Sequence, residues 1–95
     1  MDIDKVFKAL ADKTRRLIVD VIAQRDNQTL FEITAKLTTD HGLNITRQGI
    51  SKHLKILEDA QLIDISWSGK SKLHSLNPTP LKEINKRWIS KHERK

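Results

Sequence analysis

The chain has 95 residues, no cysteine and a formal net charge of +6. A chain of this length forms one domain with one modest core, and the lack of cysteine excludes disulfides, thiolate metal sites and cysteine nucleophiles. The basic balance favours a polyanionic partner, either nucleic acid or a membrane surface. The N-terminal stretch MDIDKVFKAL has neither a long apolar run nor a signal-peptide pattern. We therefore expect a soluble, cytoplasmic protein with no membrane partner.

Apolar periodicity predicts three helices in the first half of the chain. Residues 3–10 carry apolar side chains at i, i+3, i+4 and i+7. Asp12 suits the N-cap of a second helix, because its carboxylate can accept a backbone N–H of the first turn. A third helix is expected to begin near Thr29, and Gly42 suits its left-handed end.

The segment NITRQGISKHLKIL predicts a fourth helix, with Thr46 as its N-cap. The side expected to face the core carries Ile50, His53, Leu54 and Leu57. The opposite side carries Gln48, Ser51, Lys52 and Lys55, with Arg47 at its start. No acidic residue occurs before Glu58, at the far end. The exposed face is therefore cationic and rich in hydrogen-bonding groups.

The pattern then changes to the alternation of β-strands, with apolar residues at Ile63, Ile65 and Trp67. Gly69 predicts a hairpin that turns over residues 68–71. Pro80 suits the first turn of a last helix, whose apolar stripe is Leu81, Ile84 and Trp88. The expected architecture is one mainly α domain over residues 1–95, with four helices, a small β-hairpin and a fifth helix.

The fourth helix has the chemistry to enter a DNA major groove. Gln48 can pair with adenine and Arg47 with guanine, while Ser51 can contact a base or a phosphate. The hairpin tip SGKSK adds Lys70 and Lys72 for phosphates or a minor groove. The ordinary alternative is a solvated helix face and a solvent-exposed turn, and both descriptions can hold at once.

Three segments resemble the ArsR-type winged-helix regulators. VFKALADKTRRLIVDVI is similar to their opening, ITRQGISKHLKILEDAQLI to their recognition helix, and GKSKLHSLNPTPLKEINKRWI to the wing and last helix of a subgroup without obvious metal ligands. The resemblance covers nearly the whole chain. It implies a winged helix-turn-helix fold with a recognition helix over residues 46–58 and a wing over residues 66–74. Gln61 stands where the family usually has glycine, and a left-handed backbone there would strain it mildly.

The resemblance also implies a homodimer that packs its terminal helices, about residues 2–11 and 79–92, across a two-fold axis. The expected DNA-binding residues are Thr46, Arg47, Gln48, Gly49, Ser51, Lys52, Lys55, Lys70 and Lys72. The expected dimer residues are Ile3, Val6, Phe7, Leu10, Leu81, Ile84 and Trp88, which the sequence does not divide between the interface and the core of one subunit. His53 is interpreted as a packed, hydrogen-bonded residue rather than a ligand.

Metal sensing and catalysis are not expected. The last helix offers Glu83, His92 and Glu93 without a second histidine at i+3 or i+4, so no metal or other cofactor is predicted, although a site assembled across a dimer stays open. The GKS stretch lacks the glycine of a phosphate-binding loop, because Asp64 stands in its place. No serine–histidine–acid spacing suggests a triad.

Together with the chemistry of the fourth helix, the resemblance implies a homodimeric repressor that binds a palindromic operator in double-stranded DNA. Its inducer, a small molecule or a protein, is left open, as is its existence. Two alternatives are a winged-helix docking module and a binder of nucleic acid without sequence preference. Docking calls for exposed apolar anchors and non-specific binding for stacking aromatics. The outward face of the fourth helix offers neither, and Trp67 and Trp88 are expected in the core or in dimer contacts.

Overall fold

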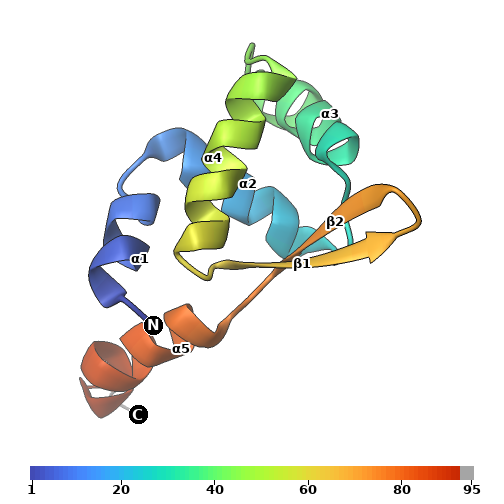
Figure 1. The fold of residues 1–95 in the computed structure, drawn as a ribbon. Coiled ribbons are helices and arrows are strands. Elements are labelled where there is room, and N and C mark those ends of the chain that lie inside the picture. The colour runs from blue at the N-terminus through green and yellow to red at the C-terminus, as the bar shows by residue number, and fades with distance from the viewer. Residues whose placement is uncertain (93–95) are drawn as a thin grey trace.

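The computed structural model describes residues 1–92, which form five α-helices and one hairpin. The elements in chain order are α1 (Ile3–Leu10), α2 (Lys13–Gln24), α3 (Leu30–His41), α4 (Arg47–Asp59), β1 (Ile63–Ser68), β2 (Ser71–Leu76) and α5 (Thr79–Ile84). A π-helical turn, Asn85–Ile89, and a 3-10 turn, Ser90–His92, extend α5. This order confirms the predicted winged helix-turn-helix architecture (Figure 1).

The helix ends form where the sequence places capping residues. Asp12 Oδ2 accepts a hydrogen bond from the Arg15 backbone N–H at 3.0 Å. Thr29 and Glu32 form a reciprocal capping box at the start of α3. Thr46 Oγ1 accepts from the Gly49 N–H at 3.0 Å. These bonds satisfy first-turn donors that would otherwise have no partner in the helix, so the predicted caps are confirmed.

Two residues with positive φ end the helices of the central motif. Gly42, at φ 62°, closes α3 as predicted. Gln61, also at φ 62°, closes α4, and the Leu62 N–H then donates to the Leu57 carbonyl at 3.0 Å. This is the paired hydrogen-bond pattern that usually employs glycine. The backbone at Gln61 is therefore left-handed, which is the condition under which mild strain was expected there.

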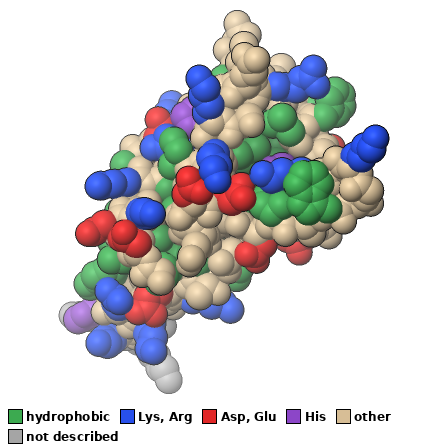
Figure 2. Space-filling view, viewed as in Figure 1, with side chains coloured by type: hydrophobic (Ala, Val, Ile, Leu, Met, Phe, Trp, Pro, Cys, Tyr) green, Lys and Arg blue, Asp and Glu red, His purple; other side chains and the backbone are tan. Residues whose placement is uncertain are grey.

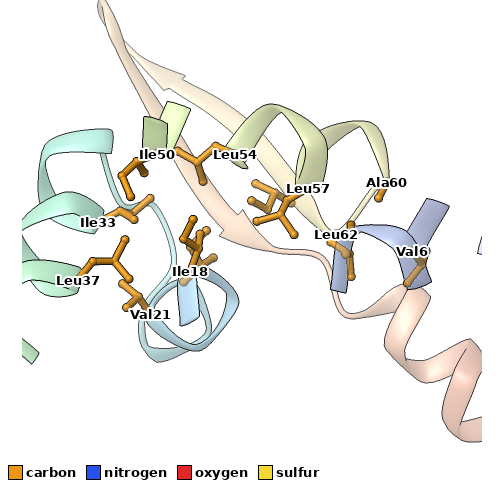
Figure 3. Packing of buried hydrophobic residues seen from close by; sticks show 13 residues of the cluster. Val6, Ile18, Val21, Ile33, Leu37, Ile50, Leu54, Leu57, Ala60 and Leu62 are labelled. Carbon is orange, nitrogen blue, oxygen red and sulfur yellow. The ribbon is translucent and has the colours of Figure 1, made fainter. Parts of the chain in front are cut away.

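The core lies between α1, α2, α3, α4 and the start of β1 (Figure 3). Its fully buried apolar side chains include Val6, Ile18, Val21, Ile33, Leu37, Ile50, Leu57 and Leu62. Val6 has no exposed surface, which corrects its assignment to a dimer interface. Its side chain points from α1 into the subunit and packs in the core.

The hairpin is attached to the body by a third extended segment. β1 and β2 pair antiparallel, with Ile65 opposite His74 and Trp67 opposite Lys72. At the edge of β2, His74 exchanges backbone hydrogen bonds with Gln28, at 3.0 and 2.8 Å. The His74 Nδ1 lies 2.9 Å from the Gln28 carbonyl oxygen, and the Gln28 amide donates to the Val21 carbonyl at 2.8 Å. The root of the hairpin is therefore held against the turn between α2 and α3.

The C-terminal helical segment lies beside α1, away from the hairpin tip (Figure 1). Pro80 occupies its first turn and is buried. The Phe7 and Trp88 rings lie 5.9 Å apart between centroids. No helix among residues 1–92 combines the length and the apolar character needed to cross a membrane.

Candidate nucleic-acid interface

The face of α4 that the sequence marks for DNA is exposed. Gln48, Ser51 and Lys52 all face solvent, whereas Ile50 and Leu54 are buried on the opposite side. The helix thus divides into a core side and a polar side, because side chains three and four residues apart share one face. The polar side is free to approach a partner.

Gly49 has a packing role within this face. A Cβ added at Gly49 would lie 3.0 Å from the Ile45 Cγ1, and its N–H is already used by the Thr46 cap. The absence of a side chain lets the loop before α4 pack closely against the helix. Its inclusion among the DNA-binding residues remains a prediction.

The cationic candidates fall into two groups. Arg47, Lys52 and Lys70 are exposed, and none of them forms an ion pair with any residue from 1 to 92. Lys55 Nζ, in contrast, lies 3.0 Å from Asp59 Oδ1. The hydrogen bond to Asp59 and the charges of Asp59 and Glu58 raise the pKa of Lys55.

Lys72 forms the second such pair. Its Nζ lies 3.2 Å from Glu58 Oε2 and joins β2 to the end of α4. Lys72 therefore faces α4 rather than extending from the hairpin tip with Lys70. A carboxylate at this distance offsets most of the attraction that the ammonium would exert on a phosphate.

A hollow of about 720 Å³ separates α4 from the hairpin. Its walls are Leu30, Gln48, Ser51, Lys52, Leu54, Lys55, Glu58, Lys72 and His74. Figure 2 shows basic side chains over α4 and at the hairpin tip, with acidic side chains between them near the end of α4. Five predicted DNA-binding residues thus line this hollow, whereas Lys70 is not among its lining residues.

His53 is confirmed as a packed, hydrogen-bonded residue. Its Nδ1 lies 3.3 Å from Arg15 Nη1, and Arg15 also donates to the carbonyl oxygens of Ala9 at 2.7 Å and Lys8 at 3.2 Å. Arg15 therefore connects the end of α1 to the middle of α4. This connection was not anticipated from the sequence.

The predicted dimer residues other than Val6 gather at the opposite end of the molecule from the hairpin. Ile3, Leu10, Leu81 and Ile84 are half-buried against the core. Phe7 and Trp88 are 45% and 50% exposed. The structure brings α1 and the C-terminal segment together and leaves two adjacent aromatic rings facing outward.

Trp67 is the residue whose environment differs most from expectation. Its side chain is 64% exposed on β1, which excludes the core, one of the two places expected for it; the other, a dimer contact, stays a prediction. Strand alternation identifies the face of the hairpin on which a residue lies, but not whether the core extends beneath it. Ile56 was likewise missed: it is 43% exposed on α4, beside Lys5 and Lys8.

Residues 1–92 contain no group of three histidine, cysteine, aspartate or glutamate side chains placed to hold a metal ion. Glu93, which was considered as a ligand, lies outside the described residues.

Comparisons with known proteins agree with this geometry. A family model described as a helix-turn-helix domain matches residues 10–65. The HTH-type transcriptional regulator YuzN of Bacillus subtilis is 49% identical over 90% of this chain and 94% of its own length. The transcriptional repressor SdpR, also of Bacillus subtilis, is 38% identical over 84% of this chain and 81% of its own length.

Among solved structures, an ArsR-like transcriptional regulator from Rhodococcus sp. RHA1 superposes with a TM-score of 0.75 and 25% identity, over 87% of this chain and 70% of that one. The sequence matches, the superposed fold and the polar, cationic face of α4 point to the same family over most of the chain. The protein belongs to the ArsR-type winged helix-turn-helix family of DNA-binding transcriptional regulators.

Proposed function

We propose that the protein is a homodimeric repressor that binds a palindromic operator through α4 and the hairpin. The observation that carries this proposal is the exposed, hydrogen-bonding and cationic side of α4 facing a hollow beside the hairpin. The relative SdpR, a transcriptional repressor, supports repression as the outcome of binding.

In this proposal α4 enters the major groove with its N-terminal half. Gln48 and Ser51 reach base edges, where an amide can pair with adenine through two hydrogen bonds. Arg47 and Lys52 flank them and contact phosphates or guanine, and Lys70 contacts the backbone from the hairpin tip. The two carboxylates near the end of α4 keep that end away from the phosphates.

The dimer is proposed to form through Phe7, Trp88 and the half-buried apolar residues around them. Two adjacent aromatic rings, each about half exposed, offer a second copy a large area to bury. A two-fold axis through this surface presents two copies of α4 to DNA, with half-sites about one helical turn, roughly 34–36 Å, apart. Occupancy at a promoter would then block polymerase sterically.

The DNA-binding part is tested by fluorescence anisotropy on the DNA upstream of this protein's gene, against a scrambled duplex of equal length. We expect a preference of about a thousandfold or more at near-physiological salt, with two chains per duplex. Gln48→Ala should reduce that preference, because base contacts discriminate between sequences. Gln24→Ala, an exposed glutamine at the end of α2, is the matched control and should change nothing.

Weak, salt-sensitive binding that is equal on both duplexes would contradict sequence-specific regulation at this site and favour non-specific nucleic-acid binding. An equal loss of affinity on both duplexes after Gln48→Ala would contradict a base contact.

The dimer part is tested by sedimentation equilibrium. Trp88→Ala should shift the protein towards monomer, whereas Phe31→Ala removes an aromatic ring that is 68% exposed on α3 and should not. A wild-type protein that stays monomeric at micromolar concentration and binds DNA one chain per half-site would contradict the proposed interface.

A further inference from the structure

Trp67 exposes a large apolar ring at a place where the subunit does not need one. It is 64% exposed on β1, close to the turn at Gly69. A tryptophan this exposed adds little to the core, and apolar area left in water is unfavourable by roughly 25 cal/mol per Å². The ring is therefore available to a partner.

The hairpin register shows on which face of the hairpin the Trp67 ring lies. Trp67 lies opposite Lys72, and Ile65 lies opposite His74. Residues directly opposite in an antiparallel pair share a face, and on this face His74 is buried while Lys72 contacts Glu58 of α4. Trp67 is thus on the side of the hairpin that faces α4, continuous with the proposed DNA-binding surface.

The charges around the Trp67 ring indicate the chemistry of the partner that the ring would contact. Beyond Trp67, at the tip, Lys70 forms no ion pair with any described residue. On the other side of the hollow, Lys52 is equally free. Between them, Lys72 is paired with Glu58 at 3.2 Å. Two phosphate-directed cations therefore flank a stretch that is close to neutral and apolar.

This arrangement matches the DNA backbone, in which apolar deoxyribose rings separate the charged phosphates. We propose that Trp67 packs against deoxyribose rings of the strand that borders the bound major groove, next to the phosphate held by Lys70. The inference rests on the proposed DNA-binding function and assigns to it a contact that is apolar and independent of base sequence.

Because the chain has only two tryptophans, the contact can be measured in the full-length protein without other substitutions. Full-length protein is labelled with 5-fluorotryptophan, and its two ¹⁹F resonances are assigned with Trp67→Phe. Binding to the upstream duplex is followed in parallel by the anisotropy of the labelled DNA. We expect the Trp67 resonance to shift and to lose its H₂O/D₂O solvent isotope shift on binding, while the Trp88 resonance keeps its position.

Affinity measurements with variants complete the test. Trp67→Ala should weaken binding roughly tenfold per half-site, the loss expected when about 60 Å² of apolar surface stays in water. The loss should be the same on the upstream and scrambled duplexes, and the salt slope should not change, because no charge is removed. Trp67→Phe should recover most of the affinity. Ile56→Ala, on the far side of α4, should change neither the affinity nor the salt slope.

The outcomes separate this inference from the function on which it rests. Binding of the duplex with an unchanged Trp67 resonance and full affinity of Trp67→Ala would overturn the inference alone. A Trp67 resonance that shifts with protein concentration in the absence of DNA would assign the ring to a protein contact and overturn it as well. No anisotropy change for the wild-type protein on either duplex would overturn both.

Discussion

Replacement of Lys70 by alanine tests whether the hairpin tip contacts phosphate. Lys70 is exposed next to Gly69, which turns the chain at φ 59°. Its ammonium has no carboxylate partner among residues 1–92. Lys72, two residues later, already pairs with Glu58 at 3.2 Å. The two lysines are close in sequence and differ in how much charge each can offer to DNA.

The magnitude follows from counterion release. Each phosphate contact contributes about 0.9 to the slope of log affinity against log salt concentration. Two subunits would contribute two contacts, so Lys70→Ala should flatten the slope by about 1.8. Between 50 and 200 mM salt, the affinity of the variant should fall about twelvefold less than that of the wild type. Lys72→Ala should flatten the slope by less than half as much.

The assay is anisotropy titration at four salt concentrations with wild type, Lys70→Ala, Lys72→Ala and Lys82→Ala. Lys82 is an exposed lysine on α5 and serves as the control for net charge. An unchanged slope for Lys70→Ala would remove the tip from the interface. Equal flattening by the Lys70 and Lys72 variants would refute the argument that Glu58 neutralises Lys72.

Three further predictions concern the fold. Leu37→Ala, at a fully buried site, should lower the free energy of unfolding, measured by urea denaturation, by about 2–5 kcal/mol. Phe31→Ala on the same helix should change it by no more than about 0.5 kcal/mol. Similar losses of stability in the two variants would contradict the core assignment of Leu37. Gln61→Gly should raise the stability by up to about 1 kcal/mol, because it relieves a left-handed non-glycine residue; a decrease would show that the side chain contributes more than the strain costs. Burial lowers the pKa of His74 from its ordinary value of 6.5. As the pH falls below 6.5, the unfolded chain therefore binds a proton at this histidine more readily than the folded chain does. The folded state then loses stability by up to about 1.4 kcal/mol per pH unit. His74→Asn should flatten that dependence below pH 6.5, and an identical pH profile for the variant would exclude His74 as its source.

The helix boundaries were predictable because their causes are local. The Asp12 and Thr46 caps each involve residues within three positions along the chain, and the left-handed end at Gly42 depends on one residue. The same holds for the exposed face of α4, since helical periodicity alone separates it from the core. These features can be read from a short window of sequence.

The partners of the charged groups were not predictable in the same way. Lys55 and Asp59 are four residues apart on one helix, and that pair could have been anticipated. Lys72 and Glu58 belong to different elements, so their contact depends on where the hairpin docks. Two cationic residues that look equivalent in the sequence therefore differ in the structure.

Burial at the ends of the molecule also depended on three-dimensional packing. Val6 and Phe7 are neighbours on one apolar stripe, yet Val6 is fully buried and Phe7 is 45% exposed. Helical periodicity gives a stripe about 100° wide and does not locate the edge of the core within it. Trp67 lies outside the core, one of the two places expected for it, for the related reason that the hairpin extends past the core beneath it.

The link between Gln28 and His74 has a consequence for the DNA rather than for the protein. Two backbone hydrogen bonds and the His74 ring fasten the hairpin to the turn before α3, and the Lys72–Glu58 pair fastens it to α4. A hairpin held at both places has less freedom to adjust its distance from α4 to different groove widths. In the proposed complex, the cost of a mismatch would fall on the duplex, which would have to bend or change its groove width. Operators should accordingly be selected in part for how easily their flanking base steps deform, at positions that no side chain touches.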